Sequence, residues 1–345
     1  MKKISIKDIA ELSGVSVATV SRVINNNGRF SEETKNKILE VIKSTGYQMN
    51  YSAKSLRMNK SFSIGILVPD ISNYFFADVV QKIEEILFNK GYSTIICNTA
   101  RNSTKETAYL QMLESKGVDG LIVISGAEEF SFNYSRPEKN IPYICIDREP
   151  KVKSDTIFIS SNHYQGAFEA TEQLIAAGCQ NPVIAMHSRK SPSALERENG
   201  FFDALKKNSI MFDREKSKLN VDIYDDNFEE SVKQFFEEQD NVDGIFAIND
   251  NIGLELIVVL KKLGFKLPKQ IKIIGFDDTP QDKYSYPALS SVKQNTAKIA
   301  QVTVDNLLET ISKPNSINIG KSFLIPVDLV LRESIYPGMD TIGKS

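Results

Sequence analysis

Residues 6–25 read IKDIAELSGVSVATVSRVIN, and this stretch decides the fold of the N-terminal part of the chain. Its first eight residues carry apolar side chains at helical spacing, Leu12 among them, which predicts a short helix over 6–13. Gly14 supplies the unhindered backbone that a tight turn between two helices needs. Ser16 can then cap a second helix, because its hydroxyl can accept a bond from an unpaired N–H of the first turn. The stretch therefore predicts a helix-turn-helix.

The second helix is expected over 17–25, with Val20, Val23 and Ile24 on its apolar side. The remaining side chains offer hydroxyls, an amide, a guanidinium and a methyl group that could touch a thymine. These groups reach phosphates and base edges of DNA. The candidate DNA-contacting residues of this region are Ser16, Val17, Ala18, Thr19, Ser21, Arg22 and Asn25. A third helix is expected to start at 31–33, to turn Ile38, Leu39 and Ile42 inward and to end near Gly46.

The charge is divided unevenly along the 345 residues, whose formal net charge is −2. Residues 1–60 hold 11 Lys and Arg against 5 Asp and Glu, a net of +6, and the rest holds 31 against 39, a net of −8. A basic head on an acidic body suggests that the head meets a polyanion, although a solvated basic face would give the same count.

Composition excludes several classes of protein. Apolar residues make up 41% and charged residues 25%, as in ordinary globular proteins, and the length predicts two or three domains. No run of 18 apolar residues could span a bilayer, and no apolar segment follows the basic N-terminus as in a secretory signal. The three cysteines, Cys97, Cys145 and Cys179, are far apart, and the two histidines are His163 and His187. We therefore expect a reducing, cytoplasmic setting with no disulfide framework, no metal site and no cofactor.

A short connecting segment, NYSAKSLR at 50–57, separates the head from the body. It has one or two helical turns and no core of its own, so we expect it to be disordered in isolation.

Beyond Lys60 the pattern changes to strands that alternate with helices. Buried strands are expected at 64–68, 92–97, 120–124 and 143–146, separated by amphipathic helices at 75–88 and 104–115. A second series starts near Ser161, with strands at 182–186, 244–248 and 271–274 and helices at 164–177, 194–207, 228–238 and 250–263. The expected fold is an all-α helix-turn-helix head with a hinge helix, followed by a two-lobed α/β domain built on parallel sheets. The expected units are residues 1–59, residues 60–336 and a tail at 337–345.

Polar and aromatic side chains follow several of these strands, where open parallel sheets bind their ligands. Carboxylates, guanidiniums and amides can make paired bonds to neighbouring sugar hydroxyls, and aromatic faces stack on sugar C–H groups. The candidates are Asn73, Phe75, Phe76, Asp147, Arg148, Arg197, Asn249, Asp277 and Gln294. Singly, each has an ordinary explanation: Asp147 and Arg148 as a surface pair, Asn249 as a helix cap, the phenylalanines as core. Their shared position at strand ends favours a ligand site.

The combined string over 6–25 resembles the DNA-binding head of the lactose-repressor family. The resemblance implies that the segment at 50–57 folds on operator DNA in a dimer and that a leucine enters the minor groove, with Ala53 and Leu56 in the matching positions. From about Phe62 to Glu333 the body resembles periplasmic sugar-binding proteins, and the strand-end residues named above match their ribose-binding set. The stretch 188–193 departs from that pattern in detail. Strings at 95–98 and 324–327 also resemble sucrose-operon repressors.

The resemblance implies a cytoplasmic transcriptional repressor of a sugar operon that binds double-stranded operator DNA as a homodimer and responds to a small sugar. Ribose is the first candidate, and fructose and sucrose are next. A purine-type regulator, in which ligand strengthens DNA binding, and a catabolite-control protein are the alternatives within the family. A transport protein would lack the basic head. An enzyme could use Asp147 and Asp277 as a carboxylate pair, but the sequence has no nucleophile elbow, P-loop or HExxH motif.

Overall fold

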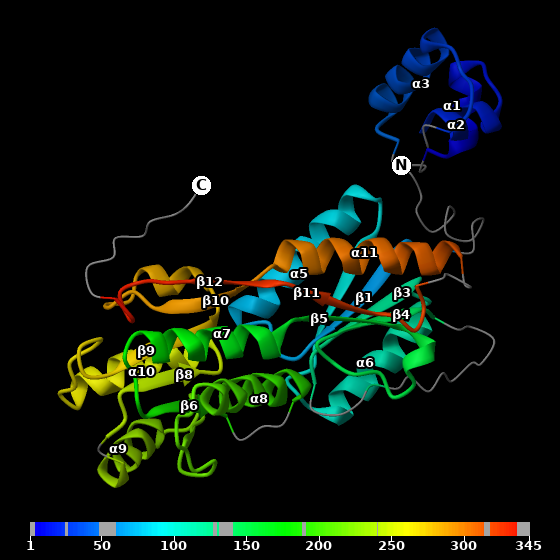
Figure 1. Ribbon diagram of the computed structural model, residues 1–345. Coiled ribbons are helices and arrows are strands. Elements are labelled where there is room, and N and C mark those ends of the chain that lie inside the picture. The colour runs from blue at the N-terminus through cyan, green and yellow to red at the C-terminus, as the bar shows by residue number, and fades with distance from the viewer. Residues whose placement is uncertain are drawn as a thin grey trace. The chain divides into compact units, whose positions relative to one another are not determined.

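Contacts within the chain divide it into two units, Met1–Ser61 and Phe62–Ser345. Figure 1 shows the structure, a computed structural model. It describes residues 4–24, 27–47, 60–126, 130, 141–187, 191–239, 241–313 and 318–336. None of the helices in these ranges is long and apolar enough to cross a membrane.

The first unit contains three helices, α1 (Ile6–Ser13), α2 (Val17–Ile24) and α3 (Glu32–Thr45). Ser5 and Asp8 cap α1 reciprocally, and Gly14 ends it in the left-handed region at φ 63°. The Ser16 hydroxyl accepts a bond from the N–H of Thr19 at 3.1 Å, which confirms the predicted cap of α2. The helix-turn-helix is therefore present with the predicted bounds, except that Asn25 lies outside the described residues.

Five buried residues form the core of this unit: Ile9, Ala10, Val20, Val23 and Ile38. The prediction that Leu39 turns inward is wrong, since it is 46% exposed, and Leu12, although it has helical spacing, is 58% exposed. Each is one residue away from a buried neighbour, and one residue turns a helix by roughly 100°. A two-turn helix has room for only one narrow apolar stripe, and Leu12 lies beside it.

The second unit holds two six-stranded sheets, ordered β11-β5-β4-β3-β1-β2 and β12-β10-β9-β8-β6-β7. Every neighbouring pair is parallel except β10 with β12. We call the two halves the first and second lobe. The two-lobed α/β fold that the alternating pattern predicts is present.

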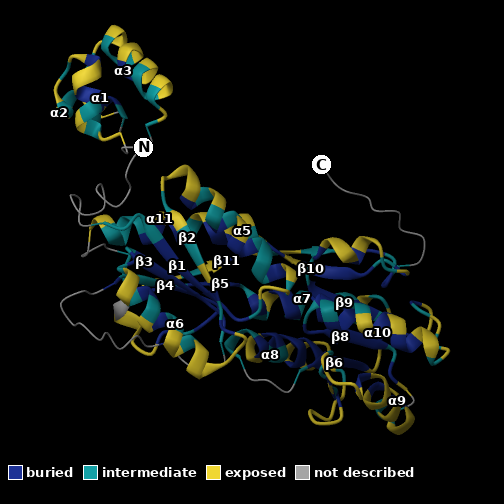
Figure 2. Cartoon of the chain, turned by 180° about the vertical axis from the view of Figure 1, so that it is seen from behind, coloured by how far each residue is buried: buried dark blue, intermediate teal, exposed yellow. Residues whose placement is uncertain are grey.

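The first lobe is a sheet with helices on both faces (Figure 1). Its strands are β1 (Ser63–Val68), β2 (Ser93–Asn98), β3 (Gly120–Ile124), β4 (Tyr143–Ile146), β5 (Ile157–Ser161) and β11 (Ser322–Ile325). One face packs against α5 (Tyr74–Asn89) and α11 (Thr296–Ser312), and the other against α6 (Ser103–Lys116). In the central strands β1, β3, β4 and β5 the side chains are mostly buried on both faces, so these strands read as continuous apolar runs, whereas the edge strands β2 and β11 are partly exposed (Figure 2).

The second lobe repeats this plan. Its strands are β6 (Pro182–Met186), β7 (Lys218–Asn220), β8 (Gly244–Ala247), β9 (Lys272–Asp277), β10 (Ser290–Gln294) and β12 (Val327–Val330). Its helices are α7 (His163–Ala176), α8 (Pro192–Lys207), α9 (Phe228–Glu238) and α10 (Asp250–Lys262), with a short 3₁₀ turn at η2 (Pro280–Lys283). The other 3₁₀ turn, η1 (Lys153–Asp155), precedes β5 in the first lobe. The sequence pattern did not identify β5, β7, α11, β11 or β12.

The chain passes between the lobes three times, after β5, after β10 and after β11. The three crossings are bonded to one another. Asn162 donates its N–H to the carbonyl of Ile325 at 2.9 Å, and Gln294 pairs with Val327 in the β10–β12 ladder. The three crossings therefore form one connected hinge. Because of the second crossing, α11 belongs to the first lobe although it comes late in the sequence.

The lobe-2 helices α7 and α8 pack unusually closely, because α8 has a glycine at the contact. A Cβ placed on Gly200 would lie 2.3 Å from the carbonyl oxygen of Tyr164 and 3.0 Å from the amide nitrogen of Phe168. Both are backbone atoms, so the two helices would have to move apart to admit a methyl group.

We expect Gly200→Ala to lower the free energy of unfolding by about 1–3 kcal/mol, since added volume in a packed contact forces backbone shifts. The matched control is Gly253→Ala on α10, whose Cβ would come closer than 3.0 Å to only one atom, at the end of the Leu289 side chain, and would make an ordinary contact with Ala247. Both changes gain the same helix propensity, so the difference between them isolates the clash. Urea denaturation followed by circular dichroism measures it, and equal stabilities would contradict the close approach.

Candidate functional site

The first candidate surface lies on α2. Ala18 and Arg22 are exposed and therefore accessible to DNA, and the capping residue Ser16 is exposed too, although its hydroxyl is bonded to Thr19. Val17 is half-buried and packs against the core of the head. The Thr19 hydroxyl is engaged with that of Ser16 at 2.9 Å, and Ser21 is half-buried. The exposed part of the predicted surface is thus narrower than the sequence suggests, with Arg22 as its charged member.

Three predicted DNA-contacting residues, Asn25, Ala53 and Leu56, lie outside the described residues. Their roles remain predictions.

The second candidate site is a cavity of about 410 Å³ in the second unit, lined by residues of both lobes. Its walls come from the carboxyl ends of the strands and the starts of the helices that follow them. Of the predicted ligand residues, these line it: Asn73, Phe75, Phe76, Asp147, Arg148, Arg197, Asn249 and Asp277. Gln294 does not line the cavity. It is buried and donates to Asp277 at 2.7 Å, so it contacts a ligand residue instead.

The strand ends that face the cavity carry strained backbone. Ser125 and Asp147 have φ of 52°, and Asp277 has φ of 125°, a region that side-chain-bearing residues rarely adopt. Such conformations persist where the surrounding structure holds them, and they concentrate at ligand sites. The three strained residues lie where strands end, and all three line the cavity.

Two of the predicted residues also serve local structure. Asn73 caps α5 and Asn249 caps α10, each accepting a bond from the N–H three residues on, at 3.4 and 3.0 Å. Phe75 belongs to the first-lobe core, and its ring meets that of Phe76 edge to face. The structural and binding interpretations of these residues are therefore compatible, because a side chain at a helix start can cap it and still line the cavity.

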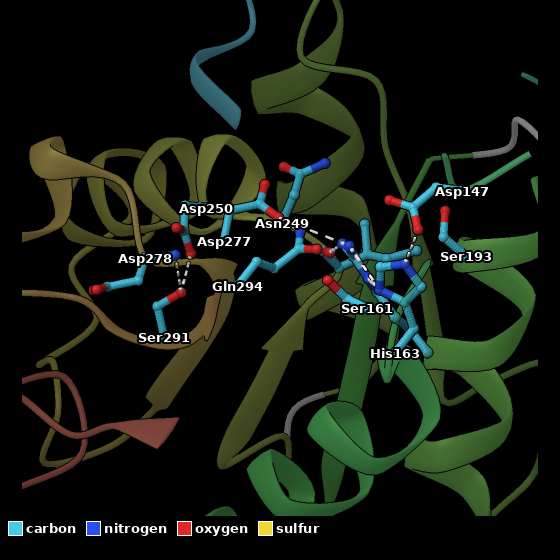
Figure 3. Close-up of polar contacts among 12 residues, drawn as sticks. Asp147, Ser161, His163, Ser193, Asn249, Asp250, Asp277, Asp278, Ser291 and Gln294 are labelled. Atoms are coloured by element: carbon cyan, nitrogen blue, oxygen red, sulfur yellow. Dashed lines mark hydrogen bonds and ion pairs between the residues drawn. The ribbon is translucent and has the colours of Figure 1, made fainter. Parts of the chain in front are cut away.

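A chain of buried polar contacts links the lobes beneath the cavity (Figure 3). Asp147, after β4, accepts from Ser160 at 2.7 Å and pairs with His163 at 2.9 Å. The other ring nitrogen of His163 meets Arg197 of α8 at 3.2 and 3.3 Å. Arg197 lies 3.7 Å from the carboxylate of Asp277 and also donates to the carbonyl of Ile248. The predicted residues from both lobes are thus joined, and His163, which is not among the residues predicted from the sequence, is the link.

Arg148 is held by a partner that the sequence did not reveal. Glu106, in the first turn of α6, accepts two bonds from its guanidinium at 2.6 and 3.1 Å. The guanidinium also stacks over the ring of Phe130, 5.1 Å from its centre. A Cβ at Gly126 would lie 2.7 Å from the Nε atom, so only glycine leaves this space for Arg148. Paired in this way, Arg148 is a fixed hydrogen-bond donor.

Other lining residues were also missed. The structure adds Arg101, Asn102 and Ser103 from the loop before α6 and the first residue of that helix, and His187, Ser191 and Ser193 from the segment before α8 and its first turn. Residues 188–190, part of the stretch that departs from the family pattern, lie outside the described residues. Their place in the sequence could have identified them, because all six follow strands that the sequence predicts.

Electrostatics single out Asp277. Burial raises the pKa of its carboxyl to about 7, the nearby carboxylates of Asp250 and Asp147 add to the rise, and Arg197 and Gln294 oppose it. Asp250, buried behind it, has its pKa raised well above the ordinary value by burial and by Asp282. This end of the cavity therefore holds carboxyls that bind protons more readily than exposed ones.

Comparisons with known proteins agree with this geometry. Residues 5–50 match the family described as bacterial regulatory proteins, lacI family. Residues 61–333 match the family of periplasmic binding proteins and the sugar binding domain of the LacI family. The chain belongs to the LacI family. It is a DNA-binding transcriptional repressor of that family and not an enzyme.

Several LacI-family relatives are similar over nearly their whole length. A ribose operon repressor of Halalkalibacterium halodurans is 31% identical over 97% of this chain and 98% of its own. A sucrose operon repressor of Streptococcus mutans is 32% identical over 95% and 98%. The repressor PurR of Photobacterium profundum is 32% identical over 96% and 98%. Relatives with three different names, for a ribose operon, a sucrose operon and PurR, are thus about equally similar.

Solved structures show the same fold. The lac repressor dimer bound to operator and an anti-inducer has a TM-score of 0.79 at 23% identity, over 97% of this chain and 99% of its own. A LacI family regulator of Enterococcus faecium with bound ribose has a TM-score of 0.69 at 25% identity, over 80% and 100%.

The raised pKa of Asp277 predicts a pH dependence of stability. Between pH 4 and 7 the folded state holds a proton on this carboxyl that the unfolded state releases, so the free energy of unfolding falls as pH rises through this range. The slope for one proton is about 1.4 kcal/mol per pH unit. Asp277→Asn removes this contribution and leaves those of the other carboxyls. We expect the variant to lose less stability than the native chain between pH 5 and 7.

The chain has no tryptophan, so circular dichroism follows the denaturant unfolding of both proteins at each pH. Parallel pH profiles would show that Asp277 does not hold the proton.

Proposed function

We propose that the chain represses a sugar-utilisation operon and that a small sugar, ribose first, releases it from the operator. The observation that carries the proposal is the buried Asp147–His163–Arg197–Asp277 chain beneath the cavity, with donors and acceptors from both lobes. Such paired groups bind adjacent hydroxyls, and charged hydrogen bonds of this kind stabilise a complex by about 1.5–3 kcal/mol each.

Three relatives or neighbouring structures support the choice of ribose, in addition to the geometry of the site. A relative named ribose operon repressor is similar over 97% of the chain, and the ribose-bound regulator of Enterococcus faecium has the same fold. A further LacI-type structure, from Alkaliphilus metalliredigens, holds D-xylulofuranose and is 28% identical, so two neighbours bind five-carbon sugars. Fructose and sucrose follow, and a purine ligand is the alternative that PurR relatives represent.

We also propose that the repressor is a cytoplasmic homodimer that places two heads on double-stranded DNA. A two-fold dimer matches the symmetry of a palindromic site. Large apolar side chains are exposed on both lobes of the single chain, among them Phe88 and Ile96 on the first and Val258 and Tyr284 on the second. A partner could cover them.

The ligand prediction is tested by calorimetry with ribose, fructose, sucrose and purines. We expect selective binding of ribose by the native chain and a loss of roughly ten- to a hundredfold in Asp277→Ala, because a carboxyl that would bond two neighbouring hydroxyls is removed. DNA binding without sugar should be unchanged in this variant, since the head is a separate unit. Tight binding of a purine instead would show that the ligand is a purine and not a sugar. Loss of DNA binding together with sugar binding would show that Asp277 is needed for folding.

The DNA prediction rests on the exposed guanidinium of Arg22. Operator duplexes are first selected from a random pool with the native chain. We expect Arg22→Ala to weaken binding to them about tenfold or more, because base and phosphate contacts of this kind are worth about 1–3 kcal/mol. Lys43→Ala, which removes one positive charge from exposed α3, is the matched control and should cost much less. Equal losses in anisotropy titrations would mean that α2 does not dock on DNA.

A further inference from the structure

His163 lies at the first of the three crossings between the lobes. It is the first residue of α7, two positions after the end of β5, and its side chain is 1% exposed. Its ring packs against that of Phe276 with centres 5.6 Å apart. A buried imidazole in this place needs hydrogen-bond partners for both nitrogens.

The partners determine where its proton sits. Arg197 approaches Nδ1 with Nε at 3.3 Å and Nη2 at 3.2 Å. A guanidinium can only donate, so Nδ1 must be the accepting, unprotonated nitrogen. The proton is then on Nε2, which donates to Oδ1 of Asp147 at 2.9 Å. The ring is therefore neutral, with a defined tautomer, between a carboxylate of one lobe and a guanidinium of the other.

This arrangement leaves one carboxylate oxygen of Asp147 without a hydrogen bond and holds the guanidinium of Arg197 in place. Oδ1 of Asp147 accepts from both His163 and Ser160, and the described part of the chain shows no hydrogen bond to Oδ2. Arg197 is fixed by His163, by the carbonyl of Ile248 and by the ring of Phe276, 3.7 Å below its guanidinium. Without the imidazole between them, the carboxylate and the guanidinium could turn toward each other and pair, which would occupy the groups that a ligand needs.

We propose that His163 is a positioning residue of the ligand site, which holds Asp147 and Arg197 apart and in register across the hinge. The inference rests on the proposed function of the cavity. His163 does so as a neutral spacer, because it accepts from one charge and donates to the other. The affinity of the site for a sugar then depends on the ring nitrogens and not only on the ring volume.

Two substitutions separate these contributions. His163→Phe keeps an aromatic ring and removes both nitrogens, and we expect it to weaken ribose binding at least tenfold in calorimetry. His163→Gln retains one donor and one acceptor, and we expect it to recover most of the lost affinity. The matched control is Thr171→Val on the same helix, since Thr171 is equally buried but bonds only the carbonyl of Ala167. It should bind ribose like the native chain.

A spectroscopic measurement tests the tautomer directly and needs no ligand. The chain has only two histidines, so ¹⁵N-histidine labelling gives two ring spectra, and His187→Gln identifies that of His163. We expect an unprotonated Nδ1 and a protonated Nε2. A protonated Nδ1, or native-like ribose affinity in His163→Phe, would overturn the proposal. If the native chain binds no sugar, the proposed ligand fails, and the ring spectrum then decides on its own whether His163 is the neutral spacer.

Discussion

The guanidinium of Arg197 is buried, and the arrangement of the second unit follows from the need to satisfy it. A buried cation is tolerated only if hydrogen bonds and opposite charge replace its hydration. Here they come from His163, Ile248 and Asp277, which belong to different parts of the sequence, with the face of Phe276 beneath. Losing any one of these contacts removes part of the compensation for the buried charge. The polar floor of the cavity is therefore fixed as a unit.

The helices and most strands could be predicted from the sequence, because their signals are local. Ser16, Ser31 and Gly46 cap helices where the pattern placed them. Leu12 and Leu39 could not be placed, because an apolar residue beside a narrow stripe looks like part of it. Strands at the sheet edges, such as β7 and β11, are short and carry polar residues, so they lack the buried-strand pattern.

Eight of the nine predicted ligand residues line the cavity, because strand ends of a parallel sheet lie on one edge and this rule needs no long-range information. The residues that hold them were harder to find. Glu106 is far from Arg148 in sequence, and its role depends on how α6 packs on the sheet. His163 lies on a helix start with no motif of its own. Partners of a site residue are set by tertiary packing, which sequence spacing does not record.

The three bonded crossings restrict how the lobes can move. A single tether would allow twisting and sliding, whereas three strands of chain joined side by side, through Asn162, Ile325 and the Gln294–Val327 pair, leave essentially one degree of freedom, a bend about the line of the crossings. A hinge of this kind has the same axis for any ligand. Ligands of different size can then change only the angle of closure, so relatives that have diverged in what they bind can retain one mechanical output.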